Sequence, residues 1–323
     1  MYLSDIKENQ EFKQQVFVIS VIEKKSKTGK AYITGEVRDK SGVFKYNLWD
    51  VNAKLTLPQA NAYFLITGTM ESYNGNSQIN LKNCQPLDES QININDFKNV
   101  SSRDLDELWL EIEQIVNTFQ DEFIIYLAKN ILTEKFVKKF KDAPAAKDVH
   151  HAWVGGLLEH SVSVAKLSDF VVKYYNDLYF ENKLSRDIVV FGSLFHDIGK
   201  VWEYDYSTPN IQATKHGEFL GHIYLSAKMI GDIAQKYKEQ HKDNDIDNKI
   251  LRIQHVILAH HGKLEWGAPV TPKTPEAIII HYMDNIDAKL MNAWENLKQC
   301  KEEFTQRNFV QENGRLYNIF LEE

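Results

Sequence analysis

The first ninety residues alternate between apolar and polar positions in short runs, the pattern of strands with one buried face. In the segment 43–49, Phe44, Tyr46 and Leu48 fall on one side of the expected strand and polar residues fall on the other. Turn-forming pairs such as Asn74-Gly75 separate the runs. Strands are predicted at 16–22, 31–37, 43–49, 62–71 and 77–83. Short strands at this density predict a small barrel or sandwich.

The period of the pattern changes near residue 101. From there apolar side chains recur with the spacing of an amphipathic helix, as in Leu105, Leu108 and Ile112. Helices are predicted at 104–119, 121–140, 157–175, 186–198, 221–238, 250–261 and 275–301, with a short β-ribbon at 202–214. The sequence therefore predicts a multidomain α+β protein: a β-barrel over residues 1–90, a linker and helical connector over 91–150, and an all-α domain over 151–323.

Length and charge are consistent with this division. A chain of 323 residues fits two domains, and 43% hydrophobic residues is ordinary for a globular protein. The net charge of −7 argues against wholesale coating of nucleic acid or of an anionic membrane. Residues 1–90 nevertheless carry a net charge of +1, whereas the remainder carries −8. The candidate basic patch for nucleic acid lies in the first part and comprises Lys24, Lys27, Lys30, Arg38 and Lys45.

The cysteine content and the hydropathy of the sequence indicate the cellular compartment in which we expect the protein. Only Cys84 and Cys300 are present, far apart, so a disulfide scaffold is excluded and a reducing compartment is expected. The sequence has no apolar run of 18 residues, and the charges within residues 1–10 do not fit a secretory signal. We therefore expect a cytoplasmic protein without a membrane partner.

Histidine is distributed unevenly, because all eleven histidines lie after residue 149. A single histidine on a helix face is usually a core residue whose ring nitrogens have hydrogen-bond partners. A metal site is therefore indicated only where several such residues occur together. Such a set comprises His160, His196-Asp197, His222, His260-His261 and Asp284, each within or at the end of a predicted helix. Imidazole nitrogen and carboxylate oxygen are the ligands that first-row divalent metals bind where thiolate is absent. A carboxylate beside apolar runs, such as Asp197, is costly to bury unless a cation neutralises it.

Seven segments occur in an order that resembles the YhaM-type 3′-5′ exoribonucleases. They are residues 143–146, 150–152, 155–161, 195–200, 221–223, 260–262 with 265–267, and 281–289. The resemblance implies an N-terminal OB-fold followed by a C-terminal HD domain, the fold of a superfamily of metal-dependent phosphohydrolases. It covers nearly the whole chain in architecture.

The resemblance also implies roles for individual residues. His160, His196, Asp197 and Asp284 correspond to the core metal ligands, and His222 and His260 complete a second site that Asp197 bridges. His261 is an alternative to His260. Asp287, three residues after Asp284 on the same predicted helix, is close enough to be either a further ligand or a partner of one. Two Mn²⁺ ions are implied, although the ligand chemistry also suits Co²⁺, Fe²⁺ or Zn²⁺.

A pair of divalent ions suits hydrolysis by a metal-activated water, because it stabilises charge on both the attacking and the leaving oxygen. The sequence has neither a P-loop nor a Gly-x-Ser-x-Gly nucleophile motif. The resemblance implies 3′-5′ exonucleolytic hydrolysis of single-stranded RNA, and single-stranded DNA is a further expected substrate. The alternatives are a phosphohydrolase of nucleotides or cyclic nucleotides, and a nucleic-acid-binding protein with a vestigial HD site. Homo-oligomerisation stays open.

Three further residues are candidates for catalysis beside Asp197. Lys200 could meet a substrate phosphate, or it could simply stabilise a helix C-terminus. His150 and His151 could contact the scissile phosphate or protonate the leaving 3′-oxygen, or they could be a packed loop pair.

The predicted barrel also contains aromatic residues that could stack on bases. They are Tyr32, Phe44, Tyr46, Trp49 and Tyr73. Because a small barrel needs most of its aromatics for the core, we expect only about one or two of them to be exposed.

Overall fold

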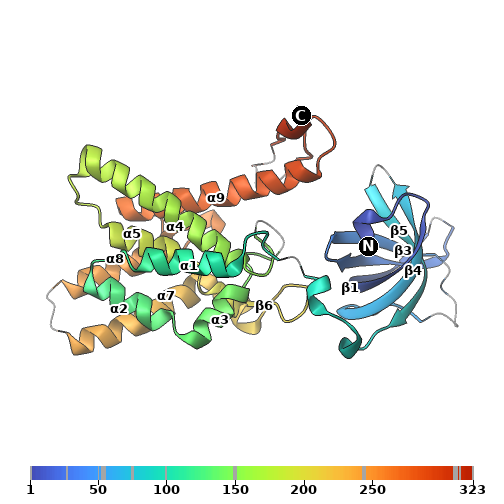
Figure 1. The fold of residues 1–323 in the computed structure, drawn as a ribbon, viewed down its shortest axis with the longest axis horizontal. Helices are drawn as coiled ribbons and strands as arrows, with labels where there is room; N and C mark the ends of the chain where they lie inside the picture. Colours follow the sequence, from blue (N-terminus) through green and yellow to red (C-terminus); the bar gives the residue numbers. More distant parts are fainter. Residues whose placement is uncertain are drawn as a thin grey trace. The chain divides into compact units, whose positions relative to one another are not determined.

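A computed structural model describes residues 2–26, 28–49, 51, 56–73, 76–98, 100–147, 151–241, 245–307, 312 and 314–321 (Figure 1). The chain forms two compact units, Met1–Asn99 with Tyr206–Ile211 and Val100–Asp205 with Gln212–Glu323. The expected connector over 91–150 is therefore shared between the units, and the three-part division stays a prediction.

The first unit contains a closed five-stranded barrel. Its strands are β1 (Glu11–Lys25), β2 (Ala31–Asp39), β3 (Gly42–Leu48), β4 (Ala62–Tyr73) and β5 (Asn76–Pro86). The order around the barrel is β1-β2-β3-β5-β4, with β3 parallel to β5 and the other pairs antiparallel. This is the five-stranded Greek-key barrel of an OB-fold, which confirms the fold prediction.

Strand alternation decides which aromatic side chains fill the barrel. Tyr46 is fully buried at 0% exposure, and Leu48 lies beside it in the same core. Trp49, the next residue, lies on the opposite side of the chain and is 43% exposed. The alternation read from the sequence is therefore the alternation in the barrel.

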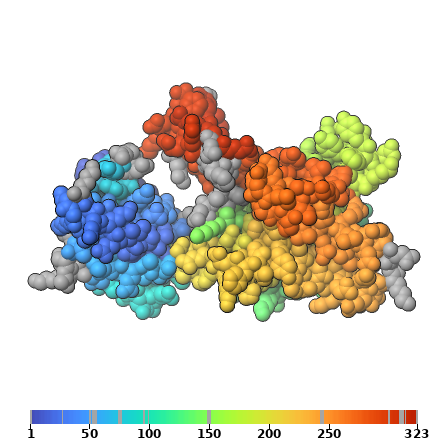
Figure 2. All heavy atoms as spheres, turned by 180° about the vertical axis from the view of Figure 1, so that it is seen from behind, coloured from blue at the N-terminus to red at the C-terminus, as the bar shows by residue number. Residues whose placement is uncertain are grey.

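The second unit is built mainly from helices. They are α1 (Leu105–Val116), α2 (Glu122–Ile131), α3 (Glu134–Asp142), α4 (Gly156–Tyr175), α5 (Arg186–Phe195), α6 (Lys200–Glu203), α7 (Lys215–Gln240), α8 (Ile246–Ala259) and α9 (Pro275–Gln299). Short strands β6 (Tyr204–Asp205) and β7 (Gln212–Ala213) form the predicted ribbon. Figure 2 shows α7, α8 and α9, in yellow to orange, along one face of this unit. Among the described residues, no helix combines the length and hydropathy required to cross a membrane.

Two helix predictions differ from the structure. The single helix expected over 121–140 is two helices, because Leu132 leaves the helical conformation with ψ 48° and Thr133 begins a new helix. The helix expected from residue 221 begins at Lys215, and Gly221 interrupts it with φ 67° and ψ 157°. A positive φ favours glycine, so this interruption depends on the residue present.

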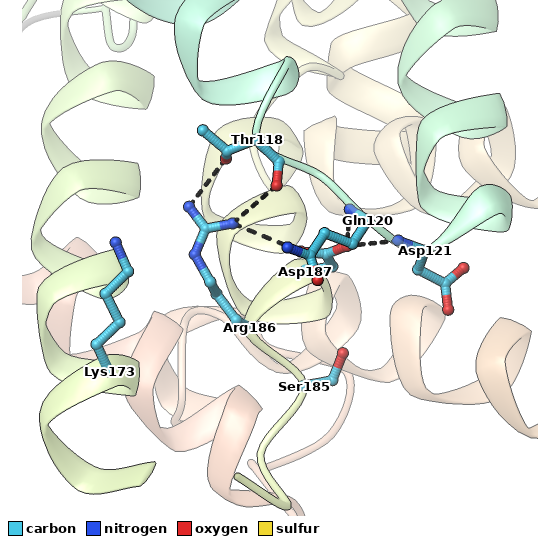
Figure 3. A pocket seen from close by; sticks show the side chains of 7 residues that line it. All are labelled: Thr118, Gln120, Asp121, Lys173, Ser185, Arg186 and Asp187. Carbon is cyan, nitrogen blue, oxygen red and sulfur yellow. Dashed lines mark hydrogen bonds and ion pairs between the residues drawn. The ribbon is translucent and has the colours of Figure 1, made fainter. Parts of the chain in front are cut away.

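Polar contacts fasten the N-terminal end of α5, whose other end leads to His196. Asp187 Oδ2 accepts hydrogen bonds from the backbone N–H groups of Gln120 at 2.6 Å and Asp121 at 2.8 Å. Arg186 donates to Thr118 Oγ1 at 2.9 Å. Figure 3 shows these residues around a pocket of about 630 Å³, and none of the lining residues is a predicted site residue. The contacts thus fix α5 from the end remote from His196.

The segment after α5 approaches α7 closely at Gly199. A Cβ atom on Gly199 would lie 2.2 Å from the carbonyl oxygen of His222, far inside van der Waals contact. This approach brings the His196-Asp197 segment to His222.

We expect Gly199→Ala to lower the free energy of unfolding by about 1–3 kcal/mol, because the added methyl group must displace backbone. Urea denaturation followed by far-ultraviolet circular dichroism measures the change. Gly231→Ala within α7 is the matched control, since its Cβ would meet only the side-chain amide of Gln254. Alanine there should leave stability unchanged or slightly higher. Equal stabilities of the Gly199→Ala and wild-type chains would contradict the close approach.

Candidate metal centre

Imidazole nitrogens and carboxylate oxygens from five helical segments converge inside the second unit. His160 lies on α4, His196-Asp197 follow α5, His222 lies on α7, His260-His261 follow α8, and Asp284 lies on α9. His160, His196, Asp197 and His260 are buried, whereas His222, His261 and Asp284 are half-buried. The structure therefore brings together every residue expected to bind metal.

Asp197 occupies the middle of this cluster and directs one oxygen to each side. Its Oδ2 atom lies 3.4 Å from His196 Nε2 and 3.6 Å from His160 Nε2. Its Oδ1 atom lies 3.3 Å from His222 Nε2 and 3.4 Å from His260 Nε2. The carboxylate thus separates the cluster into two half-sites that share Asp197.

The first half-site contains His160, His196 and Asp284 beside Asp197 Oδ2. The two Nε2 atoms of His160 and His196 lie 3.2 Å apart. Asp284 Oδ1 is 3.2 Å from His160 Nε2 and 3.7 Å from His196 Nε2. These distances are short enough for the four residues to surround a single cation.

The second half-site contains His222, His260 and His261 beside Asp197 Oδ1. His261 Nε2 lies 3.3 Å from His222 Nε2, and the possible ligand atoms of these three histidines all lie within 4.8 Å of one another. The sequence left open whether His260 or His261 faces the site. Both do, from adjacent positions at the end of α8.

The other ring nitrogen, Nδ1, of each of these histidines has an oxygen partner. These partners are the carbonyl oxygens of Ser193 for His196 (2.8 Å), Ile257 for His260 (2.7 Å) and Trp266 for His261 (2.7 Å), and the carboxylates of Asp287 for His160 (2.7 Å) and Glu203 for His222 (2.9 Å). A carbonyl oxygen can only accept, so Nδ1 carries a proton, and the Nε2 lone pair of each neutral ring faces the cluster. Metal-binding histidines are usually oriented in this way.

The protonation equilibria differ between the half-sites. Burial lowers the pKa values of His222 and His260, and burial together with His260 lowers the pKa of His261 to about 4. These rings are therefore neutral near pH 7, as ligands must be. Burial opposes the charged form of His196, but Asp197 and Asp284 outweigh it and raise its pKa to about 10. A cation in the first half-site would replace this proton.

Both carboxylates of the cluster are ionised. Burial would raise the pKa of Asp197, but Lys200 and His196 hold it well below its usual range. Burial acts in the same direction on Asp284, and the imidazoles of His160 and His196 hold its pKa well below the usual range.

Unpaired buried atoms show that the cluster fits a cation. Among the described residues, Asp197 Oδ1 and His260 Nε2 are buried polar atoms without a hydrogen-bond partner. They lie 3.4 Å apart in the second half-site. Burying such atoms unsatisfied is costly, and a cation between them would satisfy both. The donor set of imidazole nitrogen and carboxylate oxygen suits a first-row divalent metal better than Mg²⁺.

Two carboxylates support the ligands without facing the cluster. Asp287, expected to be a ligand or a partner of one, contacts Nδ1 of His160 through its Oδ2 atom. Sequence reasoning did not identify Glu203, which contacts Nδ1 of His222. Its only sequence signal is its place six residues after Asp197, at the start of the predicted ribbon.

The histidine pair before α4 is only partly described. His150 lies outside the described residues. His151 is 1% exposed, with Nε2 3.1 Å from Asp287 Oδ2 and Nδ1 3.6 Å from Glu159 Oε2. Burial lowers its pKa, but these carboxylates outweigh burial and raise the pKa to about 9. His151 thus lies on the Nδ1 side of His160, away from the converging Nε2 atoms, and the proton-donor role of the pair stays a prediction.

Lys200 lies at the cluster itself. Its Nζ atom is 2.6 Å from Asp197 Oδ2, and the side chain is buried. The ammonium group therefore adds a fixed positive charge beside the carboxylate that joins the half-sites.

Four of the five basic residues predicted to bind nucleic acid can be placed on the barrel. Lys24, Lys30 and Lys45 are exposed, whereas Lys27 lies outside the described residues. Arg38 differs from the expectation, because it is 9% exposed and its Nη1 atom donates to the carbonyl oxygen of Pro209 at 2.9 Å. Alternation along β2 places Arg38 on the outer side, but the segment Tyr206–Ile211 of the same unit covers it.

Two of the candidate aromatic residues form a pair on the outer face of the barrel. Tyr32 and Trp49 stack with ring centroids 4.5 Å apart and an interplanar angle of 25°. Lys24 is the β1 partner of Tyr32, so an exposed lysine lies beside the pair. Tyr46 is buried and Phe44 is half-buried against the same core, whereas Tyr73 is exposed at the end of β4.

Comparison with known proteins agrees with the resemblance found in the sequence. A model of the HD domain family matches residues 157–289. The 3′-5′ exoribonuclease YhaM of Bacillus subtilis (strain 168) is 33% identical over 292 residues, covering 90% of this chain and 88% of the relative. A protein of the same name from Geobacillus sp. (strain WCH70) is 31% identical over 307 residues, covering 94% and 90%.

Two solved structures of OB-fold domains each align with about a quarter of the chain. The second OB-fold domain of replication protein A from Methanococcus maripaludis aligns with 28% of this chain and 95% of that domain, at 15% identity and a TM-score of 0.23. The OB domain of MM0293 from Methanosarcina mazei aligns with 27% of the chain and 82% of that domain, at 23% identity and a TM-score of 0.24.

A cation that binds only the folded chain should stabilise it. At about one hundred times its dissociation constant, Mn²⁺ should add about 2.7 kcal/mol for each site. For a unit of this size, that predicts a rise of about 5–10 °C or more in the unfolding midpoint relative to EDTA. Differential scanning calorimetry measures the rise, which Asp197→Ala should abolish. Asp177→Ala, at an exposed position of the same unit, is the matched control and should keep it. Equal rises in all three proteins would argue against the cluster as the binding site.

Proposed function

The chain belongs to the YhaM family of 3′-5′ exoribonucleases, and from this premise we propose that it shortens single-stranded RNA from the 3′ end with the aid of two divalent cations. As a family member it is a hydrolase of phosphodiester bonds, with an HD domain at residues 157–289. The finer points of the proposal are the cations, the single-stranded substrate and the residues that act on it.

The observation that carries the proposal is the position of Asp197. Its two oxygens face different half-sites, each completed by histidine Nε2 atoms at 3.3–3.6 Å. A carboxylate shared in this way is the expected bridge between two metal ions. A vestigial HD site would have lost members of this set.

Two bound divalent cations would supply water of lowered pKa and would stabilise charge on both the attacking and the leaving oxygen. The chain's own residues have distinct roles in this proposal. Asp197 and Asp284 bind as ionised carboxylates, and the Nδ1 partners hold the imidazoles in place. Lys200 contributes a positive charge that favours the approach of an anionic phosphodiester. Mn²⁺ is the proposed metal, consistent with the ligand set.

The barrel would bind the strand through the outer face of β1–β3. The Tyr32–Trp49 pair provides an aromatic surface for a base, and Lys24 and Lys45 lie on the same face to meet the backbone. Stacking of this kind tolerates all bases and favours single strands, whose bases are accessible. Single-stranded DNA offers the same bases and phosphates, so it is the second substrate to test.

Hydrolysis of 5′-labelled single-stranded RNA, with Mn²⁺ or EDTA, tests the proposed activity. The wild-type chain should produce a Mn²⁺-dependent ladder that shortens from the 3′ end. Loss of an outer partner of a metal ligand usually costs about 10–100-fold, so Asp197→Ala should lower the rate by more than about 100-fold. Asp177→Ala should be as active as wild type.

Intact RNA in every lane would contradict the proposal as stated. The same proteins would then be assayed on nucleotides and cyclic nucleotides. Activity on a 3′-blocked RNA equal to that on free ends would contradict the polarity alone.

Binding measurements test the barrel face. In the Asp197→Ala background, where the RNA stays intact, Trp49→Ala should weaken binding of single-stranded RNA by about 1–3 kcal/mol. Fluorescence anisotropy with a labelled oligonucleotide measures this loss. Tyr73→Ala, an exposed aromatic at the end of β4, is the control and should have a smaller effect. Equal losses would contradict assignment of the strand to the Tyr32–Trp49 face.

A further inference from the structure

Glu203 contacts His222 twice, at the point where α7 is interrupted. Gly221 leaves the helical conformation, and the next residue is His222. The backbone N–H of His222 donates to Glu203 Oε1 at 3.0 Å. The Nδ1 atom of the same residue lies 2.9 Å from Glu203 Oε2. One carboxylate thus receives both the backbone donor that starts the continued helix and the ring donor of the metal-site histidine.

We propose that Glu203 is the positioning residue of the second metal site, and that through His222 it sets the affinity of this half-site independently of the first. The inference rests on the two-cation function proposed above. Glu203 does not face the cluster. It acts by holding the Nδ1 proton and the ring plane of His222, so that the Nε2 lone pair points to Asp197 Oδ1.

The remaining contacts of Glu203 fix it in turn. Its backbone N–H donates to the carbonyl oxygen of Gly199 at 3.0 Å, and its own carbonyl oxygen accepts from Thr214 N–H at 2.8 Å. The two ends of the Tyr204–Ala213 ribbon therefore lie next to Glu203. Two backbone hydrogen bonds hold the short segment that carries the carboxylate. These backbone hydrogen bonds fix the position from which the Glu203 side chain reaches His222.

The two half-sites are alike in that each contains one histidine supported by a carboxylate. In each, one histidine has a carboxylate at Nδ1, Asp287 behind His160 and Glu203 behind His222. His196, His260 and His261 have carbonyl oxygens instead. A carboxylate raises the basicity of its imidazole more than a carbonyl does, so each half-site has one strengthened ligand. Removing one carboxylate should therefore weaken one site selectively.

Titration of the full-length chain with Mn²⁺ tests this, with isothermal calorimetry for the affinities. Electron paramagnetic resonance distinguishes an isolated Mn²⁺ ion from a coupled pair. Glu203→Gln keeps an acceptor for the His222 backbone N–H but loses the ionised partner of Nδ1. It should weaken the second ion by about 10–100-fold and leave the first, so that the signal of isolated Mn²⁺ replaces that of the pair. Asp287→Asn should weaken the first ion instead, and Glu239→Gln, exposed near the end of α7, should change neither.

Two Mn²⁺ ions bound to Glu203→Gln with wild-type affinities would overturn this inference alone, as would an equal loss at both sites. A wild-type chain that binds a single ion would overturn the two-cation part of the proposed function as well. If Glu203→Gln melts earlier than wild type in EDTA, Glu203→Asp decides, because it restores the carboxylate. It should recover part of the lost affinity, and an affinity no better than that of the Gln variant would contradict the positioning role.

Discussion

The second unit is organised around one buried carboxylate, that of Asp197. Its side chain is 3% exposed and ionised, and a charge in such a position is costly unless groups around it compensate. Compensation comes from Lys200 and from imidazoles on separate helices. For these groups to reach one carboxylate, the helices that carry them must end or pass at the same point. The close approach at Gly199 and the interruption at Gly221 are local consequences of this requirement.

The charged groups around the cluster do not neutralise one another, and the remaining negative charge favours the binding of cations. Asp197, Asp284, Asp287 and Glu203 all have pKa values below their usual range, so all four are ionised near neutral pH. Lys200 and the raised pKa values of His196 and His151 offset only part of this negative charge. The rings of His222, His260 and His261 stay neutral, which preserves their lone pairs. An excess of carboxylates around neutral imidazoles is the condition in which divalent metal binding is favourable.

The periodicity of apolar positions predicted much of the fold, because a strand or helix that buries one face places its apolar side chains at regular intervals along the sequence. Tyr46 and Trp49 lie on opposite sides of β3, as their alternation requires. The residues of the candidate metal site were also identifiable, since His and Asp beside apolar helical runs are unusual. Contacts between segments that are distant in the sequence could not be predicted from it. The burial of Arg38 depends on Pro209, and the role of Glu203 depends on an interruption of α7 that no local pattern of hydrophobicity marks. The choice between His260 and His261 was open because adjacent residues at a helix end can both turn inward.

The two units contribute different physics to the proposed reaction. Residues outside the first ninety carry a net charge of −8, which opposes the long-range attraction of an RNA strand. In the proposed function, affinity for the polymer therefore comes from the barrel, where Tyr32 and Trp49 present an aromatic surface beside lysine. An enzyme that removes nucleotides successively has to accept every base, and stacking does so because every base has a π face. In the proposed reaction, stacking in one unit and metal chemistry at the backbone phosphate in the other would both be independent of base identity. The arrangement thus suits the shortening of RNA of any sequence.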